Sequence, residues 1–364
     1  MLWGGRYDRG IVTAVTARVP AKVNLQLSVG PPGADGYHDL VTVFHALSLF
    51  DEVTVTSADT DSVVVTGEGA RSVPLGPDNL AARAVAALVN AVGPGVRDAP
   101  GLAIEIRKRI PVAAGLAGGS ADAAATLVAC NELWRTGLSQ AELCELAAGI
   151  GSDVAFGLVG GTAIGVGRGE RVTPALAAGT YHWVLAFATG GLSTAQVYAA
   201  CDRIRAARRP QTAASQGQAV ADGPVGPRDQ AGTAPVNQAG RAARAGRTSP
   251  VAPPSPLALD NRLMVALRSG NPAEVGPLLA NDLQQAAISL RPELRRTLAA
   301  GIEHGALAAI VSGSGPTCAY LARDARHAAA LAVALAGAGV CRTVVHVVGP
   351  VTGASVTSVA TEPV

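Results

Sequence analysis

One short segment, residues 111–125, constrains the fold of this chain more than any other. It reads PVAAGLAGGSADAAA and lies between an alternating strand pattern and an apolar helical pattern. The start of a helix leaves N–H groups unpaired and carries a partial positive charge, and small residues let an anion reach those groups. The segment therefore favours a phosphate-binding turn. A plain tight connection between a strand and a helix is the alternative.

Several known motifs do not fit this segment. No G-K-[ST] follows it, and a G-x-G-x-x-G dinucleotide site would also need an acidic residue after the next strand. A serine-hydrolase elbow, G-x-S-x-G, is also excluded. Asp122 stands two residues after Ser120, and Ser312 stands two residues before Ser314, where the motif needs glycine. The hydroxyl of Ser120 is left as a helix cap or as a contact to a phosphate or its metal ion.

The surrounding pattern predicts a mixture of α and β structure. In the first predicted strand, Lys22 and Asn24 share a polar face while Val23 and Leu25 share the opposite one, since strand side chains alternate. Ser139 and Glu142 form a capping box that opens a helix ending near residue 149. The predicted strands are 13–30, 40–49, 52–56, 101–110, 308–312 and 317–321, and the predicted helices are 79–90, 257–267, 292–303 and one that starts at 120.

Composition narrows the class of protein. The chain has 364 residues, 49% hydrophobic, which is enough for two domains. A net charge of +2 gives no electrostatic case for binding nucleic acid. The five cysteines are scattered and form no C-x-x-C pair, so neither a zinc knuckle nor a disulfide framework is indicated. This cysteine usage fits a reducing compartment. The first ten residues lack the apolar core of a signal peptide, and the run at 328–340 is shorter than the roughly 20 residues of a bilayer span. We expect a cytoplasmic protein without a membrane partner.

Residues 206–256 differ from the rest of the chain. They are rich in Ala, Gly, Pro, Gln, Arg and Ser and contain hardly any large aliphatic residue. Such a segment cannot bury enough apolar surface to offset the entropy of ordering it. The composition predicts a disordered insertion.

Three separated motifs together resemble the GHMP kinase superfamily. They are PAKVNL with ADGYH (20–25 and 34–38), the segment at 111–125, and GSGPT (313–317), in that order. The resemblance covers nearly the whole chain except the first dozen residues and the 206–256 segment. Ala113, Ala114 and Ala117 stand where many members have glycine, and Ala121 stands where a second serine is common.

The resemblance implies a two-domain α+β fold. An N-terminal domain of the ribosomal protein S5 domain 2 type would span 13–178 after an extension at 1–12, and a ferredoxin-like C-terminal domain would span 179–364. It also implies a kinase that uses ATP and Mg²⁺, with magnesium ligands left unknown. The ADGYH turn and the GSDVAF segment (151–156) imply a small-molecule acceptor that carries a cytidine diphosphate group, phosphorylated on a tertiary alcohol. We expect a monomer or a weak homodimer.

The resemblance also assigns roles to residues. Asp153 would be the catalytic base, and Lys22 would stabilise that carboxylate and the developing charge. From the residues alone, Asp153 could instead cap the next element, and Lys22 could be a surface lysine on an edge strand. The ATP-binding residues implied are Pro111, Val112, Ala113, Ala114, Gly115, Leu116, Ala117, Gly118, Gly119, Ser120 and Ala121.

The implied acceptor-binding residues come from three regions. Asn24 lies on the strand of Lys22, and Tyr37 with His38 lies at a turn and matches the cytidine site of the family. Ser314 and Gly315 would close over phosphates or substrate. Thr194 and Tyr198 match the same cytidine pocket, although Tyr198 could equally be core packing. His38 has no His or Cys nearby at the spacing of a metal site.

Overall fold

The structure is a computed structural model, and it describes residues 11–208 and 257–363. The predicted extension at 1–12 and the predicted insertion at 206–256 therefore lie outside the described residues, except for their inner ends. Residues 11 and 12 begin a strand, and residues 206–208 end a helix.

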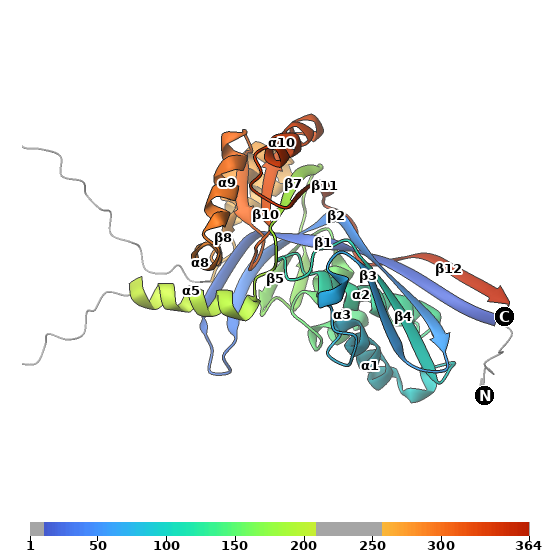
Figure 1. The fold of residues 1–364 in the computed structure, drawn as a ribbon. Helices are drawn as coiled ribbons and strands as arrows, with labels where there is room; N and C mark the ends of the chain where they lie inside the picture. Colours follow the sequence, from blue (N-terminus) through green and yellow to red (C-terminus); the bar gives the residue numbers. More distant parts are fainter. Residues whose placement is uncertain (1–10, 209–256, 364) are drawn as a thin grey trace, which may run out of the picture.

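The first sheet has eight strands and is built on two very long ones, which run through the whole molecule (Figure 1). Its strand order is β12 (Ser355–Pro363), β1 (Ile11–Pro32), β2 (His38–Ala58), β4 (Gly101–Lys108) and β3 (Ser62–Gly67). Three further strands pair off this path: β5 (Thr162–Gly167) with β2, β6 (Arg171–Pro174) with β5, and β8 (Ala280–Asn281) with β1.

Helices cover this sheet, and one of them, α2 (Gly118–Leu133), contains the second half of the segment at 111–125. The others are α1 (Leu80–Val92), α3 (Gln140–Ala148) and α4 (Val154–Val159). Helix α2 packs on β1 and β2 and also contacts α1, α3 and α4, so nearly all of its sides are buried. Its alanines permit this close approach: a Cβ added at Gly157 of α4 would lie 2.8 Å from the Cβ of Ala124.

The second sheet has four strands and forms the other end of the molecule (Figure 1). Its order is β11 (Thr343–Gly349), β7 (Tyr181–Phe187), β10 (Cys318–Ala322) and β9 (Ala308–Val311). The helices of this half are α5 (Thr194–Arg208), α6 (Asn261–Ser269), α7 (Pro272–Val275), α8 (Gln284–Leu290), α9 (Glu293–Glu303) and α10 (Ala325–Gly337). Three 3₁₀ turns complete the described elements: η1 (Ala70–Ser72), η2 (Pro94–Val96) and η3 (Gly276–Leu278).

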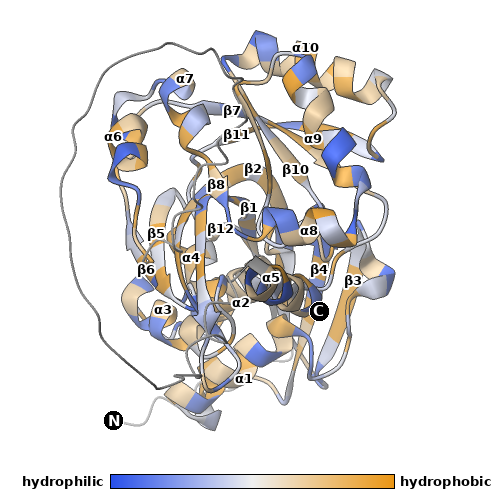
Figure 2. Ribbon diagram, turned by 90° about the vertical axis from the view of Figure 1, so that its left-hand side faces the viewer, coloured by the Kyte–Doolittle hydropathy of each residue, from blue (hydrophilic) through white to orange (hydrophobic). Residues whose placement is uncertain are grey.

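Helices α9 and α10 pack against the second sheet, and the exposed side of α9 is largely polar (Figure 2). Buried leucines along them, Leu294, Leu331 and Leu335, join the core beneath. Burying a leucine side chain stabilises a fold by roughly 1.5–3 kcal/mol. Among the described residues, no helix is both long enough and apolar enough to cross a bilayer.

The final strand returns to the first sheet. β12 belongs by sequence to the predicted C-terminal domain, yet it pairs antiparallel with β1, from Ile11 opposite Pro363 to Arg18 opposite Ser355. The first and last described strands therefore lie side by side (Figure 1).

Most predicted elements are present, although the helix predicted at 257–267 begins only at Asn261, and the prediction of two separate strands was wrong. We predicted separate strands at 40–49 and 52–56, but a single strand, β2, runs through both. The polar Asp51 lies between the two predicted strands. In the structure Asp51 is fully buried within the strand because it has charged and N–H partners there.

Candidate active site

A cavity of about 780 Å³ lies where the two halves of the molecule meet. That volume is in the range of roughly 300–1,000 Å³ that small-molecule sites occupy. Strand β1, the segment at 111–120, the turn at 36–38, helix α5 and the turn at 313–314 all contribute to its lining. The sequence-predicted site residues that line it are Lys22, Asn24, Tyr37, His38, Ala113, Ala114, Gly115, Ala117, Gly118, Gly119, Ser120, Asp153, Thr194, Tyr198 and Ser314.

The segment from Pro111 to Ser120, which we call the glycine loop, leaves the start of α2 open. Its residue before the helix, Ala117, has φ 60° and provides no side-chain cap. We expected the helix to start at Ser120, but it starts at Gly118, so Ser120 is its third residue and not its cap. Within the described chain, no main-chain N–H from Ala113 to Ser120 donates a hydrogen bond. An uncapped helix start with free N–H groups suits an anion.

The carbonyl groups of the glycine loop are, by contrast, held by the protein. Ala113 O accepts from Leu192 N at 3.1 Å, Ala114 O from Thr317 N at 3.4 Å, and Leu116 O from Lys22 N at 3.4 Å. Gly115 O accepts from the Ser312 hydroxyl at 3.0 Å. Because the carbonyls face the protein, the unpaired N–H groups are the polar main-chain atoms left for a ligand.

Lys22 does not lie at an open sheet edge, because it pairs with Ala46 of β2 on one side and its N–H donates to Leu116 O of the glycine loop on the other. The side chain is 6% exposed. Its ammonium donates to Asn24 Oδ1 at 2.7 Å and to Gly115 O at 3.0 Å, and it lies 3.6 Å from Asp153 Oδ2. Burial lowers the pKa of Lys22, and the Asp153 carboxylate opposes that effect.

Asp153 directly precedes α4, as expected for a capping residue, yet its side chain makes no cap hydrogen bond. The carboxylate is 29% exposed and faces Lys22 across the cavity. The structure therefore brings together the two residues predicted to act on the reacting hydroxyl.

Asn24 is buried beside Lys22 and is fixed by its neighbours. Its Nδ2 donates to Thr42 Oγ1 at 2.7 Å, and Thr42 Oγ1 donates to Gln26 O at 2.7 Å. Since its oxygen accepts from Lys22, Asn24 holds the ammonium in place as well as lining the cavity.

Tyr37, His38 and Tyr198 gather at the far end of the cavity. The rings of His38 and Tyr198 lie 4.9 Å apart between centroids, and His38 Nε2 lies 3.0 Å from both carboxylate oxygens of Asp202. Tyr37 is 59% exposed, and the guanidinium of Arg168 covers one face of its ring at 3.9 Å. Aromatic rings with one open face are suited to stacking a planar base.

The turn from Ser312 to Gly315 closes the cavity opposite the glycine loop. Ser314 Oγ lies 3.1 Å from Thr194 Oγ1. Gly115 has φ 78°, and a Cβ there would lie 2.0 Å from Ser312 O and 2.8 Å from Gly315 N. The two turns are thus in direct main-chain contact, which only glycine at 115 permits.

Five predicted site residues do not line this cavity. Leu116 and Ala121 are buried in the core, and Gly315 packs behind the glycine loop. Pro111 and Val112 line a second, smaller cavity of about 220 Å³ on the other side of the loop.

Sequence reasoning missed several residues of the site. Asp202 and Arg168 line the cavity, yet both lie far along the chain from the turn at 36–38. Asn281 donates to Val311 O and Gly313 O, each at 2.7 Å, and so fixes the turn at 312–315. Helical spacing offered one signal: Thr194, Tyr198 and Asp202 are four residues apart and so share a face of α5.

Comparison with known proteins identifies the class. The family model described as "GHMP kinases N terminal domain" matches residues 79–163, and the one described as "GHMP kinases C terminal" matches residues 263–341. Relatives match along nearly the whole chain. The chain belongs to the GHMP kinase family.

The relatives narrow the comparison to one enzyme of that family. A 4-diphosphocytidyl-2-C-methyl-D-erythritol kinase of Mycolicibacterium gilvum is 51% identical over 343 residues, 94% of this chain and 92% of that protein. The enzyme of the same name from Nocardia farcinica is 50% identical over 95% of this chain and 97% of its own. A crystal structure of 4-(cytidine 5'-diphospho)-2C-methyl-D-erythritol kinase superposes with a TM-score of 0.63 and 30% identity, covering 92% of this chain and 99% of that one.

Proposed function

We propose that this chain transfers the γ-phosphate of ATP to the 2-hydroxyl of 4-diphosphocytidyl-2-C-methyl-D-erythritol, giving the 2-phosphate and ADP. The reaction is a step in non-mevalonate isoprenoid precursor biosynthesis. The names of relatives about 50% identical to the chain support this function. A single structural observation carries it: the carboxylate of Asp153 and the ammonium of Lys22, 3.6 Å apart, share one cavity with the free N–H groups of the glycine loop.

The proposed chemistry needs one base and one cation at the reacting hydroxyl. The Asp153 carboxylate accepts the proton of the acceptor's 2-hydroxyl. The oxygen of that hydroxyl bonds to the γ-phosphorus, and the bond from the γ-phosphorus to the bridging oxygen of ADP breaks. Lys22 keeps Asp153 oriented and lies where charge develops on the transferred group. Phosphoryl transfer depends mainly on positioning and charge stabilisation, so this pair and a phosphate-binding loop suffice.

The residues present fit ATP and a magnesium ion. The glycine loop offers N–H groups at an uncapped helix start, and a Cβ at Gly119 would meet only Leu80, so a phosphate can approach the main chain. Mg²⁺ bound with a nucleotide commonly uses one or two protein oxygens plus phosphates. Ser120 and Asp153 are the candidate oxygen donors in the cavity. When bound, the ion would neutralise phosphate charge.

The cytidine end of the acceptor would occupy the far end of the cavity. Tyr37 and Tyr198 offer aromatic surface there, and His38 offers a ring nitrogen held by Asp202. Thr194 and Ser314 offer hydroxyls nearer the glycine loop. This arrangement would place the reacting alcohol between the cytidine-binding end of the cavity and the phosphates of ATP.

The test is ATP consumption by the purified chain with the cytidylylated acceptor, homoserine and mevalonate supplied in separate assays. We expect turnover with the first alone and a new phosphomonoester signal in the ³¹P NMR spectrum of its product. Turnover of homoserine or mevalonate without the first would assign a different activity within the family.

The proposal includes a cytoplasmic protein that acts as a monomer or weak homodimer. The structure describes all five cysteines and shows no disulfide among them, which is consistent with the proposed reducing compartment. Light scattering at the assay concentration measures the oligomeric state.

A further inference from the structure

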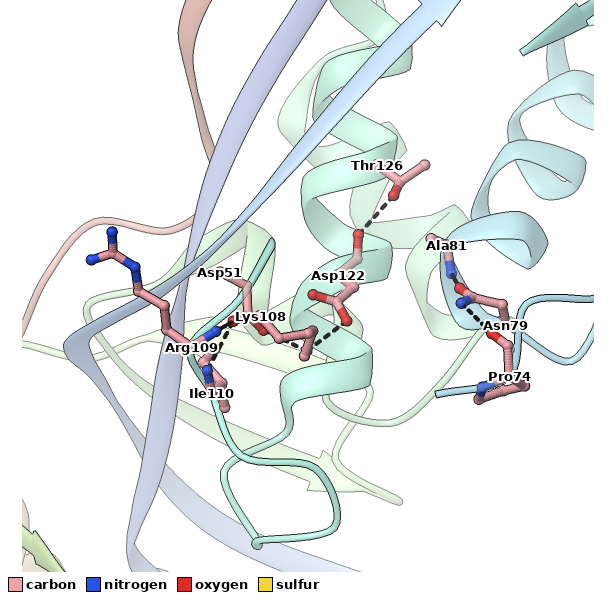
Figure 3. Close-up of polar contacts among 9 residues, drawn as sticks. All are labelled: Asp51, Pro74, Asn79, Ala81, Lys108, Arg109, Ile110, Asp122 and Thr126. Atoms are coloured by element: carbon pink, nitrogen blue, oxygen red, sulfur yellow. Dashed lines mark hydrogen bonds and ion pairs between the residues drawn. The ribbon is translucent and has the colours of Figure 1, made fainter. Parts of the chain in front are cut away.

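Three buried charged residues lie directly beneath the glycine loop (Figure 3). They are Asp51 of β2, Lys108 of β4 and Asp122 of α2, each at most 3% exposed. The ammonium of Lys108 lies 2.5 Å from Asp51 Oδ2 and 2.6 Å from Asp122 Oδ2. The proposed phosphoryl transfer uses none of them, and buried charges are costly unless the geometry satisfies them.

Asp51 holds the end of the chain that enters the loop. Its Oδ1 accepts from the N–H groups of Arg109 at 2.6 Å and Ile110 at 2.9 Å, the last two residues before Pro111 (Figure 3). The carboxylate thus fixes the direction in which the chain leaves β4.

Lys108 holds the end that leaves the loop. Its ammonium contacts Asp122 in the second turn of α2 and lies 3.1 Å from where a Cβ at Gly118 would be. The first turn of α2 therefore packs directly on the ammonium. One ion-paired group ties both ends of the glycine loop to each other.

The charges of the triad bear on the anion that the loop would bind. Burial, reinforced by the nearby Asp51 charge, raises the pKa of Asp122 to about 8, although Lys108 acts in the opposite direction. The raised pKa favours the protonated form of Asp122 at neutral pH. Asp122 Oδ1 has no hydrogen-bond partner among the described residues, which a neutral carboxyl tolerates better than a carboxylate.

We propose that Asp51, Lys108 and Asp122 form a positioning triad that fixes the two ends of the glycine loop and so sets the affinity of the loop for the phosphates of ATP. This rests on the proposed use of ATP. The triad acts through the glycine loop. It contacts neither the reacting hydroxyl nor Asp153, the proposed catalytic base.

The first test is Asp122→Ala, which cuts the link to α2 while leaving Lys108 paired with Asp51. We expect the KM for ATP, and the Kd of a non-hydrolysable ATP analogue measured by calorimetry without acceptor, to rise about tenfold or more. The KM for the acceptor should stay within about threefold, since the other end of the cavity is untouched. Asp122→Asn keeps an oxygen for Lys108 and should restore both values.

Thr126→Val is the matched control, because Thr126 is buried one turn further along α2 and bonds only to Asp122 O, at 2.8 Å. It should leave the KM for ATP unchanged. An Asp122→Ala enzyme with a normal KM for ATP, or with both KM values raised together, would overturn the proposal.

A pH series provides a second readout that survives if Asp122→Ala fails to fold. Ionisation of Asp122 above about pH 8 adds a negative charge near the start of α2, so the Kd of the analogue should rise there in the wild type. The charged groups acting on Asp122 are Lys108 and Asp51, and Lys22 titrates nearby in both proteins. Asp122→Asn should therefore lose this alkaline rise, and an unchanged rise would contradict the triad. Because calorimetry needs no acceptor, failure of the proposed acceptor leaves this test intact.

Discussion

Lys22 is the residue at which the separate parts of the site meet. Its ammonium touches the glycine loop through Gly115 O, holds Asn24, and faces Asp153, while a Cβ at Gly313 would come within 3.0 Å of it. The sequence predicted Lys22 and Asn24 on one strand face. It could not predict their burial, because that depends on the glycine loop and the turn at 312–315, which come from far along the chain to cover them.

Asp153→Asn tests the base directly. The amide keeps the shape of the side chain but accepts no proton, so kcat should fall by about 10²–10⁴. The KM for ATP should change little, since the free N–H groups of the loop remain. Steady-state kinetics with each substrate varied in turn measures both values. A kcat within a factor of a few of the wild type would remove Asp153 from the role of base.

The glycine loop gives a pair of opposite substitutions. Gly115→Ala would put a Cβ 2.0 Å from Ser312 O at a positive φ, so we expect a loss of about 2 kcal/mol or more in the free energy of unfolding. Ala117→Gly relieves a positive φ that costs alanine about 1–2 kcal/mol, less the entropy cost of glycine, so stability should hold or rise by about 1 kcal/mol.

Urea denaturation of both variants measures these changes. Ala114→Gly is the control, because Ala114 lies in the same loop without a positive φ and should lose about 0.5–1 kcal/mol. A stable Gly115→Ala protein would mean that the contact between the two turns is looser than the structure has it.

At the scale of elements, helix α5 forms one wall of the proposed cytidine-binding end of the cavity. Thr194, Tyr198 and Asp202 share the face that lines the cavity. Tyr198→Ala removes the ring that packs on His38, so the KM for the acceptor should rise about tenfold while the KM for ATP stays constant. Arg203→Ala, exposed on the same helix and outside the cavity lining, should change neither. A rise in both KM values for Tyr198→Ala would instead point to a packing role for Tyr198.

Elements with regular patterns were predictable, and those with buried charge were not. The capping box at Ser139 and Glu142 is present, because it depends only on residues three apart. The triad of Asp51, Lys108 and Asp122 was missed, since its members come from three elements and Lys108 looks like an exposed residue at the end of an alternating strand. The same buried Asp51 lies in the gap between the two strands that were wrongly predicted in place of β2. Buried ion pairs leave no periodic signal in a sequence.

At the scale of the whole molecule, His45 links stability to pH. It lies on β2 of the first sheet and packs edge-on against Tyr181 of the second, with ring centroids 5.6 Å apart. Burial lowers its pKa to about 3, so the folded protein keeps the ring neutral. The unfolded chain takes up a proton near pH 6.5, and the folded state therefore loses stability as the pH falls from 6.5 toward 3.

We expect the difference in unfolding free energy between the wild type and His45→Gln to change by at most about 1.4 kcal/mol per pH unit over that range. The glutamine can keep the bond to Thr162 Oγ1, which His45 Nδ1 makes at 2.8 Å, but does not titrate. Urea titrations of both proteins at pH 7 and pH 5 measure it, and comparing them cancels the other histidines. Parallel losses in the two proteins would exclude His45 as the acid-sensitive group.

The pairing of β12 with β1 has a consequence for how the protein is made. Thr357 Oγ1 donates to Thr16 O across 341 positions of sequence. The ribosome therefore synthesises β1 long before β12, and the edge of β1 that pairs with β12 stays unpaired until then. Bare edges invite pairing with other chains. During synthesis, the edge of β1 that β12 covers therefore stays open until the last strand has been made.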